Sequence, residues 1–195
     1  ELHSLIDNFE IPDHIKVIRI VGWGRDTIKA IKYKSDVRCS VNQQTGDCNF
    51  VNVLEHEPVV TIEGDETVVT PSADFQSFET RYINLNSYNK LLKKNFKHSN
   101  IFEADLVLDV IKNAFLGEQL PINTFLSSSK PQTSENQKNL RIGIHSPVSI
   151  GLFDELNNHT GVSSNSIPDS DLKFIEENVS NSYYLEMGEG KYAGF

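Results

Sequence analysis

A nearly continuous run of β-branched residues restricts how this chain can fold more than any other feature. Residues 15–21 read Ile-Lys-Val-Ile-Arg-Ile-Val and lead directly into the segment 22–24, Gly-Trp-Gly. Such runs are typical of strands buried on both faces of a mainly parallel sheet, which helices cover in α/β proteins. Two helix-like segments downstream, 86–96 and 101–116, fit that scheme, and Gly117 marks the end of the second. The sequence therefore predicts the α/β class.

Between the first strand and these helices the sequence indicates a β-hairpin excursion. Cys39 and Cys48 lie on either side of a polar turn at 41–47. They can form a disulfide across the hairpin if their Cβ atoms approach within about 4.5 Å, and two free core thiols are the alternative. The β-rich segments of this region are 28–33, 51–54 and 58–62.

A Ser-rich polar segment at 126–139 divides the chain. It contains Pro131 and has the composition of a linker or an exposed loop. We expect one domain at 1–125, the α/β part, and a second unit at 140–195. The second unit alternates apolar and polar residues in short segments, which is typical of a small antiparallel β-sandwich piece.

The composition limits the possible partners and locations. A net charge of -9 argues against nucleic acid and against an anionic membrane, since like charges repel. No stretch approaches the roughly 18 consecutive apolar residues of a transmembrane helix. Glu1 and Phe195 both look like cut ends, and a signal peptide could have been removed. With the expected disulfide, this predicts an extracellular or periplasmic protein, including one at a cell surface.

No cofactor or metal is expected. Glu55, His56 and Glu57 are the most metal-like cluster, but adjacent residues of a strand point to opposite faces. No second pair of ligands follows at helical spacing, so these residues do not predict a metal site.

Asp65 and His98 are the residues with the clearest potential for catalysis. Asp65 follows a β-rich segment within Gly-Asp-Glu-Thr-Val, where nearby amides can hold its carboxylate, and His98 lies on a loop before 101–116. An acid followed by a histidine is the chain order of Ser-Asp-His hydrolases, in which the nucleophile precedes both. We expect the carboxylate within about 3.5 Å of an imidazole nitrogen. The alternatives are a turn aspartate that caps local amides and a solvated loop histidine.

These residues together resemble the last third of the lecithin:cholesterol acyltransferase-like lipase family, over about 15–116. The strand ending in Gly22-Trp23-Gly24, the Gly-Asp-Glu-Thr-Val segment and His98 with its following helix carry the resemblance. In that family Gly-Asp-Gly-Thr-Val supplies the triad acid, and Glu66 here replaces the middle glycine. The resemblance implies an α/β-hydrolase fold, with Asp65 as triad acid and His98 as general base acting on a lipid or other ester.

The nucleophile of such a triad is missing. No Gly-x-Ser-x-Gly motif occurs anywhere in the sequence. We therefore expect the serine before Glu1, in an N-terminal part of the hydrolase domain that this chain needs as its partner, and we expect the chain alone to be inactive. The alternative is a non-enzymatic extracellular interaction protein on the same scaffold.

Overall fold

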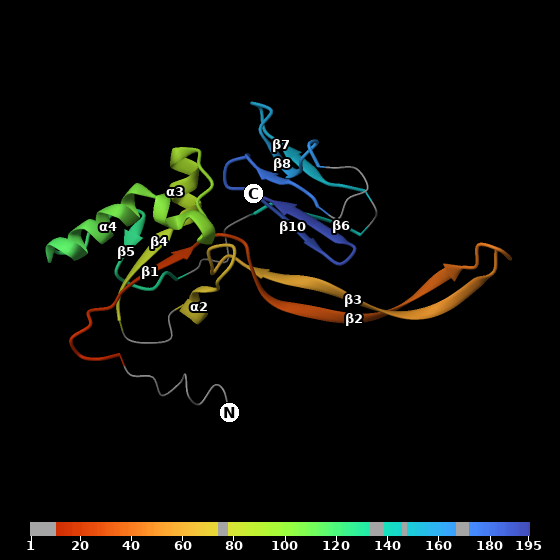
Figure 1. The fold of residues 1–195 in the computed structure, drawn as a ribbon, viewed down its shortest axis with the longest axis horizontal. Helices are drawn as coiled ribbons and strands as arrows, with labels where there is room; N and C mark the ends of the chain where they lie inside the picture. The colour runs from red at the N-terminus through yellow and green to blue at the C-terminus, as the bar shows by residue number, and fades with distance from the viewer. Residues whose placement is uncertain (1–10, 74–77, 133–138, 146–147, 167–171) are drawn as a thin grey trace.

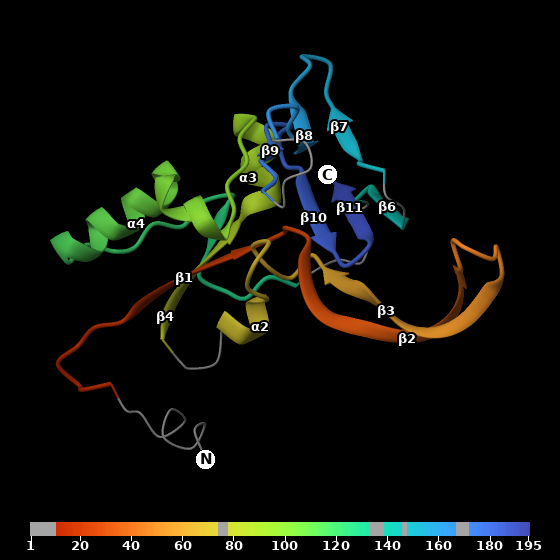
Figure 2. The same ribbon diagram turned by 45° about the vertical axis from the view of Figure 1, so that its right-hand side comes forward.

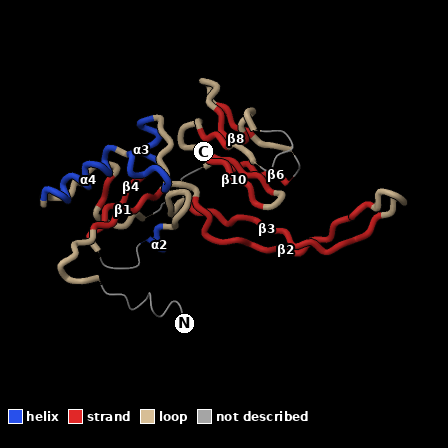
Figure 3. The backbone as a smooth tube through the Cα atoms, viewed as in Figure 1, coloured by secondary structure: helices blue, strands red, loops and turns tan. Residues whose placement is uncertain are grey.

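The computed structural model describes residues 11–73, 78–132, 139–145, 148–166 and 172–195. Strands account for 43% of these residues and helices for 18%, and the strands form four small separate sheets. Figure 1 shows two helices beside the first sheet, a long ribbon that projects to one side, and two further sheets near the C-terminus. Figure 3 shows strands in the long ribbon and in the C-terminal sheets, and it also shows the short helix α2 (Thr70–Ala73).

The first sheet carries the helices and the main core. Strand β1 is parallel to β4, which pairs on its other side with the short antiparallel β5. Helix α3 begins directly after β4, where the Asn84 side chain accepts a hydrogen bond from the Ser87 amide at 3.0 Å. Helix α4 ends at Gly117, whose φ of 70° suits a glycine. The bounds are β1 Ile18–Trp23, β4 Glu79–Asn84, α3 Leu85–Leu92, the 3-10 helix η1 His98–Glu103, α4 Asp105–Leu116 and β5 Leu126–Ser127.

The core of this sheet and its helices is small and apolar. Its fully buried members come from β4, the start of α3, the residue before α4, one face of α4, and β5. They are Ile83, Leu85, Ala104, Val107, Val110 and Leu126. Burial of these side chains removes apolar surface from water, which is the main term that holds the two helices against the strands.

The predicted hairpin and disulfide are both present, in the antiparallel ribbon of β2 (Thr27–Val41) and β3 (Cys48–Thr61). The register pairs Cys39 with Phe50 and Val41 with Cys48, so the two cysteines are diagonal neighbours on one face and form a disulfide. Figures 1 and 2 show that the ribbon leaves the rest of the fold and ends far from the helices. The two strands have 15 and 14 residues, so the ribbon is much longer than the segments 28–33, 51–54 and 58–62 that the sequence indicates.

The C-terminal part contains short antiparallel strands, but they form small separate sheets, so the fold class expected for the chain is wrong here too. They make two sheets, one in the order β10-β11-β6 and one in the order β7-β8-β9. The bounds are β6 Arg141–His145, β7 Gly151–Phe153, β8 His159–Val162, β9 Ile175–Glu177, β10 Tyr183–Met187 and β11 Gly190–Gly194. Residues 133–138 of the expected linker lie outside the described residues, so the domain boundary at 126–139 stays a prediction.

The α/β class and the α/β-hydrolase fold are wrong. The fold is predominantly β, and among the described strands β1 and β4 are the one parallel pair. The β-branched run does form a strand, but β1 begins only at Ile18, most of its residues are half-buried, and it has β4 as its one neighbour. β-propensity specified the strand, whereas the number and direction of its neighbours depend on contacts distant in sequence. None of the described helices is long and apolar enough to cross a membrane.

Candidate functional site

Asp65 and His98 lie in contact. The ring Nδ1 of His98 is 2.8 Å from Oδ2 of Asp65, and the main-chain amide of His98 donates to the carbonyl of Asp65 at 2.9 Å. The predicted separation of at most about 3.5 Å is therefore confirmed. The catalytic roles of the two residues stay predictions, because the geometry alone does not report a reaction.

The Asp65 carboxylate is held in one orientation. Its Oδ1 accepts hydrogen bonds from the amides of Val68 at 2.8 Å and Thr67 at 3.2 Å, and the residue is only 6% exposed. Gly22 of β1 lies directly beneath, since a Cβ added there would be 2.9 Å from the Asp65 Cβ. The absence of a side chain at Gly22 thus lets the Asp65 loop approach the end of the strand.

The loop around Asp65 is fastened to the chain just before β2. The Arg25 amide donates to the Gly64 carbonyl at 2.9 Å, and the Glu66 amide donates to the buried Thr27 hydroxyl at 2.8 Å. That hydroxyl in turn donates to the Arg25 carbonyl at 3.0 Å. Because the β2–β3 ribbon starts and ends here, its base and the Asp65 loop form one hydrogen-bonded unit.

His98 begins η1 and is held from the opposite side. The preceding turn is fixed by Asn89 of α3, whose side chain accepts from the Phe96 amide at 2.8 Å and donates to the Phe96 carbonyl at 2.9 Å. The Lys97 amide donates to the Asn100 side chain at 2.8 Å. The His98 side chain itself is 49% exposed. The ring is therefore anchored at Nδ1, and the side chain is half-exposed.

This geometry selects one tautomer of His98. The Asp65 carboxylate, whose Oδ1 already accepts two amides, is an acceptor, so Nδ1–H donates to it and Nε2 carries the lone pair. Within the described part of the chain, no side chain or amide forms a hydrogen bond with Nε2. An imidazole in this state can accept a proton at Nε2 while the carboxylate stabilises the resulting cation.

A second histidine–carboxylate pair differs from the first in its access. His159 Nδ1 is 2.9 Å from Glu176 Oε2, but its ring stacks on Phe153, and its Nε2 lies over the backbone of Gly151 and Gly161. A Cβ added at either glycine would lie within 2.9 Å of that nitrogen. The His159 side chain is less exposed than that of His98 and packs within the β7-β8-β9 sheet.

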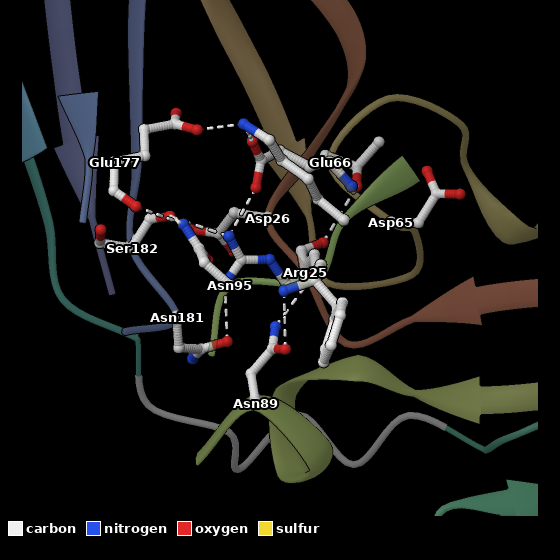
Figure 4. A network of polar contacts seen from close by, with 12 residues as sticks. Arg25, Asp26, Asp65, Glu66, Asn89, Asn95, Glu177, Asn181 and Ser182 are labelled. Atoms are coloured by element: carbon white, nitrogen blue, oxygen red, sulfur yellow. Dashed lines mark hydrogen bonds and ion pairs between the residues drawn. The ribbon is translucent and has the colours of Figure 1, made fainter. Parts of the chain in front are cut away.

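A network of charged side chains includes the residues next in sequence to Asp65 and His98, and Figure 4 shows Glu66, Arg25 and Glu177 of this network together with Asp65. Arg25 Nη2 donates to Glu66 Oε2 at 2.5 Å, Lys97 Nζ donates to Glu66 Oε1 at 3.1 Å, and Lys97 also binds the Glu177 carboxylate. Burial lowers the pKa of Lys97, but the hydrogen bonds and negative charges of Glu177 and Glu66 outweigh this, so that its pKa is raised.

Sequence reasoning missed Arg25, Lys97 and Glu177 and noted Glu66 only as a departure from a motif. The available signal was adjacency, because Glu66 follows Asp65 and Lys97 precedes His98. Nothing in the sequence pointed to Glu177. Among the described residues no group of three or more His, Cys, Asp or Glu side chains could hold a metal ion, and the metal-like Glu55 binds Arg38 instead.

Comparison of the chain with protein-family models, with curated proteins and with solved structures found no match. The resemblance to lecithin:cholesterol acyltransferase-like lipases is therefore overturned, both by this result and by the β-rich fold of separate small sheets.

Proposed function

We propose that Asp65 and His98 are the orienting acid and the general base of a hydrolase or acyltransferase that acts on esters. The observation that carries this is the 2.8 Å contact between His98 Nδ1 and the buried Asp65 carboxylate, in a His98 side chain that is half-exposed. A histidine arranged in this way is what activation of a hydroxyl nucleophile requires.

The reaction would follow from the proton positions. His98 Nε2 would remove the proton of a serine hydroxyl as its oxygen attacks the ester carbonyl carbon, and Asp65 would stabilise the imidazolium. The imidazolium would then return the proton to the departing alcohol oxygen. The acyl group would then be an ester of the serine. Water or an acceptor alcohol would attack this ester while His98 takes the proton of the incoming molecule, and the proton would return to the departing serine oxygen.

The serine would come from outside the described residues, since no described hydroxyl binds Nε2 of His98. A lipid or other ester remains the proposed substrate class. We also propose an extracellular or periplasmic location, supported by the Cys39–Cys48 disulfide, because disulfides persist mainly in oxidising compartments.

The test is ester hydrolysis by the full-length protein with His98→Ala, measured on p-nitrophenyl esters of increasing acyl length. We expect a loss of about 10²- to 10⁴-fold with the folded state retained. The matched control is His145→Ala, which removes a histidine whose ring packs edge-on to Tyr192 and whose Nε2 is 3.4 Å from the Tyr192 hydroxyl. Wild-type rates in the His98 variant would refute the general-base role.

A second candidate is a non-enzymatic interaction protein, favoured by the ribbon. Opposite pairs of a two-stranded ribbon share a face, and one face here exposes apolar side chains together with the disulfide. These side chains are Ile31, Tyr33, Val37, Val41, Phe50 and Leu54. Full-length protein that hydrolyses none of the esters would favour this candidate over the first.

A further inference from the structure

We infer that Glu66 and Lys97 are positioning residues for the Asp65–His98 pair, and that the segment 177–182 completes this site by holding Lys97 and Arg25. The inference rests on the proposed function and deepens it, because it assigns part of the C-terminal region to the same site.

Two neighbouring links join the Asp65 loop to the His98 turn. Glu66 follows Asp65 in sequence and Lys97 precedes His98, and the Lys97 ammonium donates to the Glu66 carboxylate at 3.1 Å. This ion pair lies beside the Asp65–His98 hydrogen bond and connects the same two segments. A movement of His98 away from Asp65 must therefore also separate a partly buried pair of charges.

Glu66 occupies a backbone conformation that side chains rarely adopt. Its φ is 84°, in the region that favours glycine. Such a conformation persists where the surrounding contacts hold it, and Glu66 has strong contacts with two cations, Arg25 and Lys97. The ion pairs of the Glu66 side chain with Arg25 and Lys97 thus offset the strain of its backbone.

Arg25 connects Glu66 to the C-terminal part. Its side chain is 2% exposed, so the guanidinium requires partners for its charge and its donors. Besides Glu66, it donates through Nη1 to Asn181 Oδ1 at 2.6 Å and through Nη2 to the Ser182 carbonyl at 2.8 Å. Among the described residues Glu66 is the one carboxylate bound to it.

The segment 177–182 also holds the turn that carries His98. The Glu177 carboxylate binds Lys97, and Asn95 Nδ2 donates to the carbonyls of Glu177 and Ser182, each at 3.1 Å. Figure 4 shows this segment, the Arg25 side chain and the Glu66 loop meeting around one cluster. Two cations and two carboxylates therefore alternate in the order Arg25, Glu66, Lys97, Glu177.

The position of His98 thus depends on residues about eighty positions later in the chain. Displacements of about 1 Å at a general base lower catalysis strongly, by as much as about a hundredfold. Release of Lys97 from Glu177 should disturb the Asp65–His98 hydrogen bond without removing either member.

The experiment uses the protein labelled with ¹⁵N at histidine. Its readout is the proton resonance of the His98 Nδ1–H, which slow solvent exchange makes visible when the hydrogen bond to Asp65 is formed. We expect Glu177→Gln and Lys97→Met to broaden or abolish this resonance, and Glu177→Asp and Lys97→Arg to retain it. In the full-length protein, Glu177→Gln should lower kcat about tenfold or more with KM little changed.

The matched control is Glu176→Gln. It removes the negative charge of the residue before Glu177, and the Glu176 carboxylate binds His159 and Ser163 instead of Lys97. It should leave the His98 resonance intact. Retention of the resonance in both Glu177→Gln and Lys97→Met would overturn the inference, as would an equal loss in Glu176→Gln. If the resonance responds as expected but the full-length protein hydrolyses no ester, the proposed function fails while the positioning link stands.

Discussion

His98 is joined to Asp65 twice, through its main-chain amide to the Asp65 carbonyl at 2.9 Å and through its ring Nδ1 to the carboxylate at 2.8 Å. The first bond sets the distance between the two backbones, and the second sets the rotation of the ring. Local hydrogen bonding thus fixes a half-exposed ring, whereas the less exposed His159 ring lies against the backbone of Gly151 and Gly161.

Replacement of the carboxylate should reveal whether this pair is catalytic. Asp65→Asn keeps the shape but offers an amide to Nδ1, which favours the wrong tautomer, so we expect ester hydrolysis by the full-length protein to fall roughly 10³- to 10⁴-fold. The control is Asp154→Asn, a turn aspartate that accepts from the amides of Leu156 and Asn158 without a histidine. Similar small effects in both variants would favour the reading of Asp65 as an ordinary turn aspartate.

At position 66 a glycine variant should be more stable than an alanine variant, which is the reverse of the usual order. Both Glu66→Gly and Glu66→Ala leave the buried Arg25 without its carboxylate, which should lower the free energy of unfolding by about 3–5 kcal/mol. Because φ is 84°, the Gly variant should be more stable than the Ala variant by about 1–2 kcal/mol in urea unfolding. The control position is Lys112, which is exposed on helix α4. There Lys112→Ala should be more stable than Lys112→Gly by about 1 kcal/mol. If Glu66→Ala proves more stable than Glu66→Gly, the backbone at position 66 is not strained.

The disulfide should matter for the ribbon and not for the candidate site. Cys39→Ser with Cys48→Ser removes a cross-link with a sequence separation of 9, which should lower the free energy of unfolding by at most about 3 kcal/mol. Hydrogen exchange should accelerate in the amides near the tip, since that part of the ribbon is exposed. The His98 Nδ1–H resonance should be unchanged, and its loss would show that the ribbon tip supports the site.

Alkaline pH should destabilise the fold through Tyr183. Burial and the nearby Asp26 carboxylate raise the pKa of Tyr183 above its ordinary value of about 10. The folded state then keeps a proton that the unfolded state releases, so stability is complete below about pH 10 and declines as the pH rises further. The raised pKa of Lys97 acts in the same direction. Urea unfolding at several pH values between 9 and 11 should show this decline.

The variant Tyr183→Phe isolates the contribution of Tyr183 from that of Tyr184, whose pKa burial also raises. Its stability should decline less steeply with pH than that of the wild type, whereas Tyr33→Phe, at an exposed position of the ribbon, should follow the wild type. A wild-type slope in Tyr183→Phe would assign the alkaline loss to other groups.

Local patterns of the sequence were enough to predict several elements and one contact. Periodicity predicted α4 and its end at Gly117, and the turn between the cysteines predicted the hairpin and its disulfide. The proximity of Asp65 and His98 was predicted from the chain order of Ser-Asp-His hydrolases, although the hydrolase fold that this order suggested is wrong. The helix, the hairpin and the disulfide depend on residues close in sequence or on short turns, which backbone preferences and side-chain spacing specify directly.

What the sequence determined by itself was therefore the identity of individual elements and the Asp65–His98 pair. Tertiary structure alone decided that the β-branched strand joins a three-stranded mixed sheet, that the long ribbon stands apart, and that Glu177 reaches Lys97. The physical reason is that strand pairing and buried ion pairs join positions far apart in the chain. A charged residue looks the same in sequence whether it is solvated or buried against a partner, and the fold decides which of the two it is.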